Sequence, residues 1–593
     1  VFAGQPYLTP SYMMDKGYGQ QTIMDDTDFT GWRNERIVPE LSDKLILEHL
    51  QKVQRTNQIK PSDKLEGRYN LTIEMETGVG KTYTYIKTMY ELNKHYGWSK
   101  FIVVVPSIAI REGVYKSFQV TQEHFAEEYG KKIRFFIYNS AQLTEIDRFA
   151  SDSSINVMII NSQAFNARGK DARRIYMKLD EFRSRRPIDI IAKTNPILII
   201  DEPQSVEGKQ TKERLKEFNP LLTLRYSATH KADSIYNMVY RLDAMEAYNK
   251  RLVKKIAVKG ITESGSTATD GFVYLESINL SKADPTATIQ FDCIGAKGLR
   301  KKTATVGIGY NLYDYSGNLD EYKVGFVVKA IDGRDNSVEF LNGVKIFAGD
   351  VIGKVSEDQL RRIQIRETIL SHLERERQLF HKGIKVLSLF FIDEVAKYKQ
   401  YDEVGHPFNG IYADMFEEEY NDILSSMQRE IGDEDYIRYL DAISAHDTHA
   451  GYFSVDKKGK MTDSKLSDKK EGTSDDIDAY DLIMKNKELL LDRDPKKSPV
   501  RFIFSHSALR EGWDNPNVFQ ICTLKQSNSE VRKRQEVGRG LRLCVNQDGE
   551  RMDANVLGND VQSINVLTVI ASESYDSFAK GLQTELAKDI VDR

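Results

Sequence analysis

Short runs of apolar residues, separated by polar or amphipathic spans, dominate residues 67–255. Each run has the length and the β-branched and aromatic content of a buried strand. Continuous apolar strands that alternate with helices predict a parallel sheet covered on both faces, which binds ligands at the carboxyl ends of its strands. The runs are Leu71–Ile73, Phe101–Val105, Ile133–Tyr138, Val157–Ile160, Ile197–Ile200 and Leu222–Tyr226.

The pattern changes after residue 255. Asn342-Gly343 is typical of a two-residue hairpin turn and separates short strand patterns, which predicts a small antiparallel β insertion. The predicted strands of this insertion are Val324–Ile331, Val338–Leu341 and Val344–Phe347. Ser356 and Gln359 then have the spacing of a capping box at the start of a long helix, which opens a second α/β unit. Its apolar runs are Val386–Ile392, Arg501–Phe504, Val518–Leu524 and Val566–Ile570.

These patterns predict an α/β chain with two parallel-sheet lobes and the β insertion between them. The 593 residues are too many for one hydrophobic core. We expect an N-terminal covering segment at 1–66, a first lobe at 67–255, the insertion at 256–355 and a second lobe at 356–593.

A phosphate-binding loop is predicted after the first apolar run, at Met75-Glu76-Thr77-Gly78-Val79-Gly80-Lys81-Thr82. Gly78 and Gly80 let the backbone turn its N–H groups toward a polyphosphate at the start of the next helix. Lys81 supplies positive charge, and the Thr82 hydroxyl reaches a Mg²⁺ that bridges the phosphates. A glycine-rich turn with only a structural role is the alternative. We expect ATP and Mg²⁺ as cofactors, with ATP bound by Thr77, Gly78, Val79, Gly80, Lys81 and Thr82.

Two carboxylates follow the strand Ile197–Ile200 directly. Asp201 is expected to hold Mg²⁺, and Glu202 to orient and deprotonate the attacking water, because phosphoryl transfer depends on positioning and charge neutralisation. The alternative is an acidic loop start without function. Further polar residues, Gln204, Ser227 and Thr229, are predicted to sense the nucleotide site and couple it to the rest of the lobe.

The second lobe carries a Gln-x-x-Gly-Arg-x-x-Arg element that begins at Gln535. Arg539 and Arg542 lie three residues apart, and on one face if the segment is helical. Guanidinium forks are suited to clamping a transferring phosphate, so we expect both to be catalytic. A solvated basic helix is the alternative interpretation.

Composition adds three constraints. Cys293, Cys522 and Cys544 are too few for a disulfide framework or a metal cluster, which fits buried packing residues in a reducing cytoplasm. No apolar run has the length of about 18 residues that spans a membrane. The net charge of −4 gives no global indication of nucleic-acid binding, so contacts with a polyanion must be local.

The whole set of motifs resembles a superfamily 2 helicase or translocase motor, with two RecA-like lobes and ATP between them. More narrowly, the chain resembles the restriction (Res) subunit of Type III restriction-modification enzymes over nearly its whole length. The segments that carry this resemblance are Met75–Thr82, Val105–Gly113, Asp201–Gln204, Gly451–Lys458 and Arg510–Pro516.

The resemblance implies a DNA-dependent ATPase that acts on double-stranded DNA with a modification methyltransferase subunit. It implies that Lys81, Asp201, Glu202, Arg539 and Arg542 act on ATP, and that Gly512, Asp514 and Gln535 help to bind it. It also implies that DNA contacts, or their coupling to ATP, involve Pro106, Ser107, Arg111, Ser162, Gln163 and Arg510.

Two other functions stay open on the sequence alone: a free-standing DNA or RNA helicase, and a nucleotide-gated scaffold with little turnover. The chain contains no Pro-Asp dipeptide of the kind that a Pro-Asp…Glu-x-Lys nuclease requires. We therefore expect ATP hydrolysis without DNA cleavage by these residues, and a natural protein that continues past Arg593, with its nuclease domain there.

Overall fold

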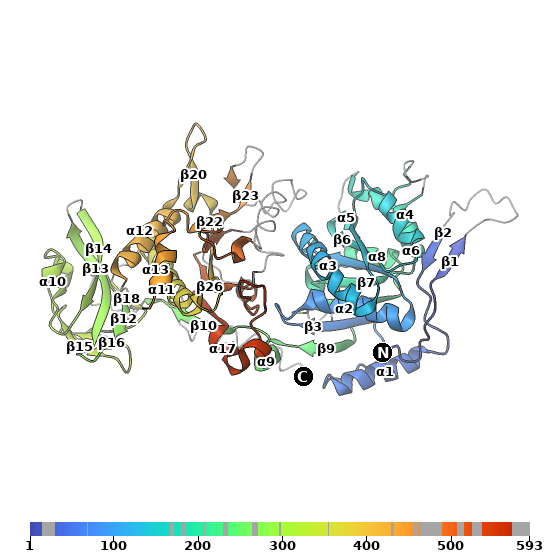
Figure 1. Ribbon diagram of the computed structural model, residues 1–593, viewed down its shortest axis with the longest axis horizontal. Coiled ribbons are helices and arrows are strands. Elements are labelled where there is room, and N and C mark those ends of the chain that lie inside the picture. The colour runs from blue at the N-terminus through green and yellow to red at the C-terminus, as the bar shows by residue number, and fades with distance from the viewer. Residues whose placement is uncertain are drawn as a thin grey trace. The chain divides into compact units, whose positions relative to one another are not determined.

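The computed structural model describes most of the chain, and its elements are shown in Figure 1. The described residues are 1–14, 30–67, 69–166, 171–179, 182, 185–206, 208–228, 230, 235–263, 271–295, 298–353, 355–427, 432–455, 460–462, 489–506, 515–524 and 536–571. They form two compact units, one from the described residues up to Val253 and the other from Lys254 onward.

The first unit is built on a seven-stranded sheet in the order β5-β6-β4-β7-β8-β3-β9, and all of its strand pairs are parallel. Its strands are β3 (Asn70–Met75), β4 (Lys100–Val105), β5 (Arg134–Ile137), β6 (Asn156–Asn161), β7 (Ile197–Asp201), β8 (Leu222–Ser227) and β9 (Met238–Leu242). Its helices are α1 (Asp43–Thr56), α2 (Lys81–Tyr96), α3 (Ile108–Tyr129), α4 (Thr144–Ser151), α5 (Gln163–Asn166), η1 (Asp171–Tyr176), α6 (Pro187–Lys193), α7 (Pro203–Val206), α8 (Lys209–Glu217) and α9 (Ala244–Asn249). An antiparallel pair, β1 (Ser11–Met14) and β2 (Thr30–Arg33), lies outside this sheet.

Both faces of this sheet are covered, as the continuous apolar runs predicted. Val103 of β4 packs in one cluster with Ile86 of α2 and Phe118 of α3. Its neighbour Val104 packs in a second cluster with Phe149 of α4. Successive residues of a strand point to opposite faces, so a strand buried on both faces must be apolar at every position. Helices α1, α2 and α3 cover one face, and α4, α6 and α8 the other (Figure 1).

The second unit contains a six-stranded parallel sheet in the order β10-β27-β26-β19-β25-β22. Its strands are β10 (Lys255–Gly260), β19 (Leu387–Phe391), β22 (His449–Tyr452), β25 (Phe502–Ser505), β26 (Val518–Thr523) and β27 (Val566–Ala571). Its helices are α11 (Glu357–Phe380), η5 (Val395–Lys397), α12 (Ile411–Ser426), α13 (Glu434–Asp441), η6 (Leu489–Leu491), α16 (Ala554–Leu557), η7 (Gly558–Asp560) and α17 (Val561–Ile564). Two small hairpins are β20 (Lys399–Tyr401) with β21 (Pro407–Asn409) and β23 (Ser454–Val455) with β24 (Met461–Thr462). The two parallel sheets confirm the predicted fold class, and the Ser356–Gln359 capping box is present at the start of α11.

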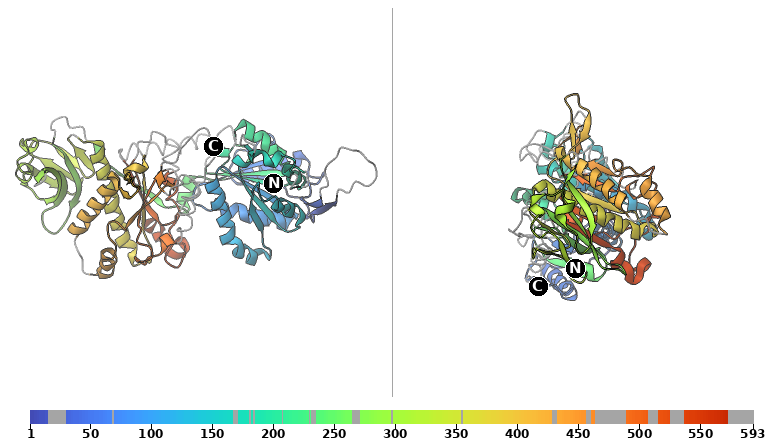
Figure 2. Two further views of the ribbon diagram at one scale, coloured as in Figure 1. Left: turned by 90° about the horizontal axis from the view of Figure 1, so that it is seen from above. Right: turned by 90° about the vertical axis from the view of Figure 1, so that its left-hand side faces the viewer.

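The predicted β insertion is present but contains more strands than the sequence indicated. A five-stranded sheet, antiparallel except for its β11–β18 pair, and a three-stranded antiparallel sheet share one core (Figure 2, yellow-green). Their strands are β11 (Thr262–Glu263), β12 (Val273–Asn279), β13 (Thr286–Gly295), β14 (Gly298–Val306) and β18 (Asp350–Ile352), and β15 (Val328–Asp332), β16 (Ser337–Phe340) and β17 (Lys345–Phe347). The short helices α10 (Leu312–Tyr315) and η4 (Asp320–Tyr322) complete it. Gly343 has φ of 83° in the predicted hairpin turn.

The polar composition of residues 451–476 predicts a solvated loop, with a DNA-facing arm as the alternative. The loop prediction is wrong at the start of this span, because Gly451 and Tyr452 end strand β22, and Phe453 is buried. The basic residues Lys457, Lys458, Lys469 and Lys470 of this span lie outside the described residues. All three cysteines are buried and free, as predicted.

A buried ion pair joins α11 to β25 in the second unit. Arg501 Nη1 donates to Glu376 Oε2 at 2.7 Å, and Arg501 Nε donates to Thr448 Oγ1 at 2.9 Å. The Tyr436 hydroxyl donates to the same Glu376 oxygen at 3.1 Å. Burial alone would raise the pKa of Glu376, but the Arg501 charge, together with His372 and the hydrogen bonds from both side chains, outweighs burial and lowers that pKa to about 2.

Replacing Arg501 should therefore destabilise the second unit strongly. Arg501→Met leaves the Glu376 carboxylate buried without its cation, so we expect the free energy of unfolding at neutral pH to fall by about 3–5 kcal/mol in urea denaturation. Because the folded pKa of Glu376 lies below the ordinary glutamate value of 4.5, the ion-pair contribution is present above that pH and is lost as pH falls toward 2. The difference between wild type and variant should shrink over this interval.

Arg438→Met is the matched control, because Arg438 pairs with Asp435 on the surface and its side chain is 76% exposed. We expect little change in stability for this variant, since exposed ion pairs contribute little. Equal effects of the two substitutions would show that the Arg501 pair does not stabilise the fold.

Candidate functional site

The predicted phosphate loop lies at the carboxyl end of β3. β3 ends at Met75, and α2 begins at Lys81 with Gly80 as its N-cap. Gly78 and Gly80 have φ of 86° and 98°, in the region that favours glycine. A Cβ on Gly80 would meet no atom within 4 Å, so the backbone conformation and not crowding requires glycine there.

Glu76 shapes this loop from within. The Thr77 amide donates to Glu76 Oε1 at 2.7 Å, and the Val79 amide donates to the Glu76 carbonyl at 3.5 Å. The Glu76 amide in turn donates to Leu242 O of β9 at 2.9 Å. Glu76 is buried and ties the loop to the neighbouring strand, a role that the sequence analysis did not assign.

Lys81 lies against both carboxylates at the end of β7. Its Nζ is 3.6 Å from Asp201 Oδ1 and forms an ion pair with Glu202 Oε1. Glu202 has φ of 54°, and its amide donates to Tyr226 O of β8 at 2.9 Å. This hydrogen bond holds Glu202 in a left-handed conformation that directs it toward the loop. The structure thus brings together residues that the sequence separates by about 120 positions.

The charges of Lys81, Asp201 and Glu202 influence one another's pKa values, and those of the two carboxyl groups shift in opposite directions. Burial raises the pKa of Asp201 to about 6, although the positive Lys81 opposes the shift. Burial would also raise the pKa of Glu202, but Lys81 and the hydrogen bonds to Glu202 outweigh it and lower that pKa. The pKa of Lys81 is raised, because the two carboxylates outweigh its burial. Lys81 and Glu202 are therefore charged at neutral pH.

Asp201 also fits the predicted Mg²⁺ site. Its buried Oδ1 forms no hydrogen bond within the described part of the chain and has the Lys81 ammonium at 3.6 Å, and Oδ2 lies 3.5 Å from the Tyr85 hydroxyl. Tyr85 interacts with Thr82, so the predicted hydroxyl and carboxylate ligands share one neighbour. A carboxylate oxygen that makes no hydrogen bond suits a hard cation such as Mg²⁺.

Two of the predicted coupling residues contact Glu202 directly. Gln204 Nε2 donates to Glu202 Oε2 at 2.5 Å, and Ser227 Oγ donates to the same oxygen at 2.8 Å. Ser227 Oγ also lies 2.9 Å from Gln204 Oε1. A change in the position of Glu202 must therefore alter the end of β8. Thr229 lies outside the described residues.

The described residues predicted to face DNA, all of them except Arg510, follow β4 and β6 at the same edge of the first sheet. Ser162 Oγ donates to Pro106 O at 3.4 Å, which joins the segments after β6 and β4. Ser107 caps α3, because its hydroxyl accepts the Ile110 amide at 3.3 Å. Arg111 Nη2 pairs with Glu112 Oε1 at 2.6 Å. Gln163 begins α5 directly after Ser162.

The arginine element is not one continuous helix. Residues 536–538 are helical, a turn follows at Arg539 and Gly540, and Arg542 lies beyond it. The condition for a shared helical face is therefore not met, because the helix ends between Gly538 and Arg539. Arg539 and Arg542 are both partly exposed. The predicted residues Arg510, Gly512, Asp514 and Gln535 lie outside the described residues.

Lys254 holds the backbone around Arg542, and the sequence analysis did not identify it. Its Nζ donates to Arg542 O at 2.5 Å, to Pro516 O at 2.5 Å and to Gly540 O at 3.1 Å. Lys254 is buried, and burial lowers the pKa of its ammonium to about 7. No sequence signal could reveal this role, because the three carbonyls lie more than 260 positions away.

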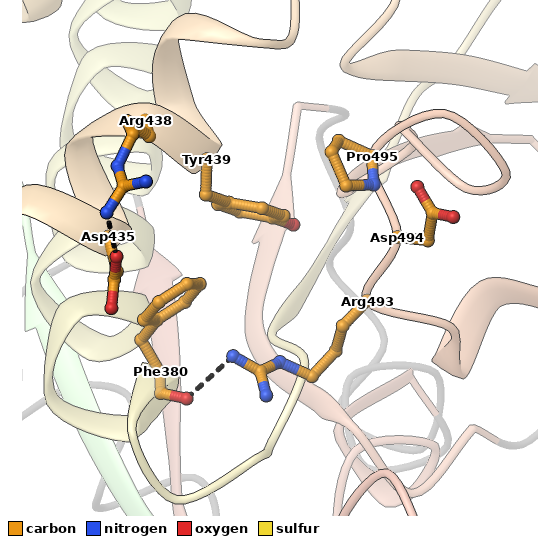
Figure 3. Close-up of a pocket in the computed structure, with 7 residues that line it drawn as sticks. All are labelled: Phe380, Asp435, Arg438, Tyr439, Arg493, Asp494 and Pro495. Atoms are coloured by element: carbon orange, nitrogen blue, oxygen red, sulfur yellow. Dashed lines mark hydrogen bonds and ion pairs between the residues drawn. The ribbon is translucent and has the colours of Figure 1, made fainter.

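A pocket in the second unit lies apart from these residues (Figure 3). Arg493 Nη2 donates to Phe380 O at 2.8 Å at one side, and Arg438 pairs with Asp435 at the other. Its lining contains none of the predicted site residues, and consists of Phe380, Asp435, Arg438, Tyr439, Arg493, Asp494 and Pro495.

Among the described helices, none is both long and apolar enough to cross a membrane.

Known proteins match most of this chain. Residues 41–232 match the family model for the Type III restriction enzyme Res subunit. The chain is 33% identical over 538 residues to the Type III restriction-modification enzyme EcoP15I Res subunit of Escherichia coli, which covers 86% of this chain and 51% of that protein. It is 32% identical over 532 residues to the EcoPI Res subunit of Escherichia phage P1, with the same coverage.

The StyLTI Res subunit of Salmonella typhimurium is 29% identical over 554 residues, which is 83% of this chain and 51% of that protein. The chain thus spans about half the length of the curated relatives that it matches. It contains a domain of the Type III restriction enzyme Res-subunit family and is similar to Res subunits over 86% of its length.

Proposed function

We propose that this chain is the ATP-dependent DNA translocase motor of a Type III restriction enzyme. The observation that carries the proposal is the contact of Lys81 with Asp201 and Glu202 at the carboxyl edge of a parallel sheet. A lysine that begins a helix after a glycine-rich loop, beside two strand-end carboxylates, is the arrangement that nucleoside triphosphate hydrolysis needs. The similarity to Res subunits supports DNA as the polymer and restriction as the purpose.

Each residue has a separate task in this proposal. Thr77, Gly78, Val79 and Gly80 present the loop backbone to the phosphates, and Lys81 binds their outer oxygens. A bound Mg²⁺ would neutralise phosphate charge, with Thr82 and Asp201 as its protein ligands. Once the phosphates engage Lys81, Glu202 loses its cation and its carboxylate can orient the attacking water.

The arginine element and the residues before it carry the remaining assignments in the proposal. Arg539 and Arg542 stabilise the charge that develops on the transferring phosphate. We assign Gly512, Asp514 and Gln535 to nucleotide binding. Gln204, Ser227 and Thr229 transmit the position of Glu202 to the segments that we assign to DNA, which contain Pro106, Ser107, Arg111, Ser162, Gln163 and Arg510.

An ATPase assay with and without duplex DNA and a cognate modification methyltransferase tests this function. We expect hydrolysis that requires Mg²⁺ and is highest when DNA and methyltransferase are both present, as for an enzyme that works in the cytoplasm with that partner. Strand separation without any methyltransferase requirement would instead indicate a free-standing helicase. Nucleotide binding without turnover under all conditions would indicate a scaffold.

Lys81→Ala should abolish hydrolysis. The substitution removes the charge nearest the transferred phosphate, and losing one such group costs about 10²–10³-fold in kcat. Steady-state phosphate release measures the loss, and the melting temperature reports whether the fold persists. Lys87→Ala is the matched control, because Lys87 lies on the same helix but pairs with Glu128 at the surface. Turnover at the wild-type rate by Lys81→Ala would remove the site assignment.

Lys254→Met should lower kcat much more than ATP affinity, as Arg542→Ala should if Arg542 acts on transition-state charge. Without its ammonium, the carbonyls of Gly540 and Arg542 lose a shared donor and the arginine is displaced. A displacement of about 1 Å can cost about 100-fold in rate, so kcat should fall much more than ATP affinity. Separate measurements of nucleotide binding and kcat distinguish the two quantities.

Lys255→Met serves as the control, because Lys255 is adjacent to Lys254 in the sequence but has an exposed side chain. It should leave both quantities unchanged. If Lys254→Met stays folded with wild-type kcat, or loses affinity and turnover equally, Lys254 does not position the arginine element.

A further inference from the structure

Three potential metal ligands meet at the amino end of β22, outside the proposed ATP site. Glu417 lies on α12, His446 lies in the turn before β22, and His449 is the first residue of that strand. One ligand atom of each lies within 4.8 Å of the others. Glu417 Oε1 is 3.0 Å from His446 Nδ1 and 3.2 Å from His449 Nε2.

These spacings are close to those of a tetrahedral zinc centre. Metal–ligand bonds of about 2.0–2.1 Å at tetrahedral angles place neighbouring ligand atoms about 3.3 Å apart. The two carboxylate–imidazole pairs already have nearly this separation. The ligand atoms of the two histidines lie within 4.8 Å of each other, and the His446 side chain is 65% exposed, which leaves it room to turn toward His449. Three protein ligands would leave a fourth position for solvent.

The surrounding groups orient the buried histidine for such a role. The Tyr398 hydroxyl lies 2.8 Å from His449 Nδ1, so this ring nitrogen is engaged and Nε2 faces the carboxylate. A partner on the second ring nitrogen is what fixes the tautomer and the orientation of metal-binding histidines. Figure 1 shows α12 and β22 as neighbouring elements of the second unit.

Hydrogen bonding alone accounts poorly for the cluster. Glu417 Oε1 also accepts from Asn409 Nδ2 at 2.9 Å, so three nitrogen atoms surround one carboxylate oxygen. A carboxylate has about four lone-pair sites over its two oxygens, which gives about two for each. A cation shared by Glu417, His446 and His449 would replace two of these crowded contacts, and Asn409 would keep its own.

We propose that Glu417, His446 and His449 form a Zn²⁺ site that ties α12 to the edge strand β22 and keeps a fourth position for solvent. Two imidazoles and one carboxylate favour zinc as the bound metal, because Mg²⁺ and Ca²⁺ prefer oxygen ligands alone. The site belongs to the fold of the second unit and does not depend on the proposed ATP chemistry. Edge strands lack a neighbour on one side, so a metal link to a helix would hold β22 in place.

The test uses the full chain after removal of metal with a chelator. Titration with Zn²⁺ alone, monitored by calorimetry, should show one tightly bound ion per chain, and metal analysis after desalting should give the same stoichiometry. Bound Zn²⁺ should also raise the melting temperature. His446→Ala should weaken Zn²⁺ binding by about tenfold to 100-fold and remove the rise in melting temperature. His446 is the variant of choice, because its exposure makes unfolding an improbable cause of the loss.

His406→Ala is the control, since His406 is a similarly exposed histidine that pairs with Asp402 away from the cluster. It should bind Zn²⁺ as the wild type does. Glu417→Gln retains a hydrogen-bond acceptor for Asn409 but removes the charge, and should also weaken binding. Wild-type protein that binds no Zn²⁺, or binding that is equal in wild type and His446→Ala, would overturn the proposal. Replacement of Zn²⁺ by Co²⁺ should give visible absorption typical of tetrahedral nitrogen and oxygen ligation, which His446→Ala should lose.

Discussion

The ion pair of Lys81 with the carboxylates of Asp201 and Glu202 is the interaction on which the candidate site depends. Buried charges are costly unless they are paired, and here one cation compensates two adjacent acids. The raised pKa of Asp201 favours its neutral form and so reduces the free-energy cost of burying it, whereas Glu202 stays ionised beside Lys81. A triphosphate would compete with Glu202 for the same ammonium. The charge balance of the site therefore links phosphate binding to the release of Glu202.

Hydrogen bonds connect Glu202 to the end of a neighbouring strand of the sheet. Glu202 Oε2 accepts hydrogen bonds from Gln204 and Ser227, and Ser227 is the last residue of β8. Ser162 and Pro106, at the ends of β6 and β4, lie along the same carboxyl edge. Because every strand of this sheet is parallel, one edge collects all the polar strand ends. The fold thus places the proposed ATP site and the proposed DNA contacts on one parallel sheet.

The sequence predicted the interior strands of both parallel sheets and the edge strand β5, but not the edge strands β9, β10 and β22. In β9 and β22 only the two end residues are buried, and no residue of β10 is buried. Such strands lack the continuous apolar run that identified the interior ones. Lys81, Asp201 and Glu202 were predictable, because each follows or precedes a recognisable run by a fixed spacing. Lys254 and the helix end before Arg539 were not, because only distant contacts determine them.

The β insertion is joined to the second unit by buried charges. Arg366 of α11 donates to Glu276 of β12 at 2.6 Å, and to Glu419 and Asp422 of α12 at 2.8 Å and 2.7 Å. Removing one partner from such a network is costly, so the insertion cannot separate from α11 and α12 without exposing or orphaning charge. Phe272, Tyr274 and Val351 of the insertion also belong to the core that contains Ile365 of α11. The insertion must therefore move with the second parallel sheet as one body, which makes it an extension of that lobe and not a separately tethered module.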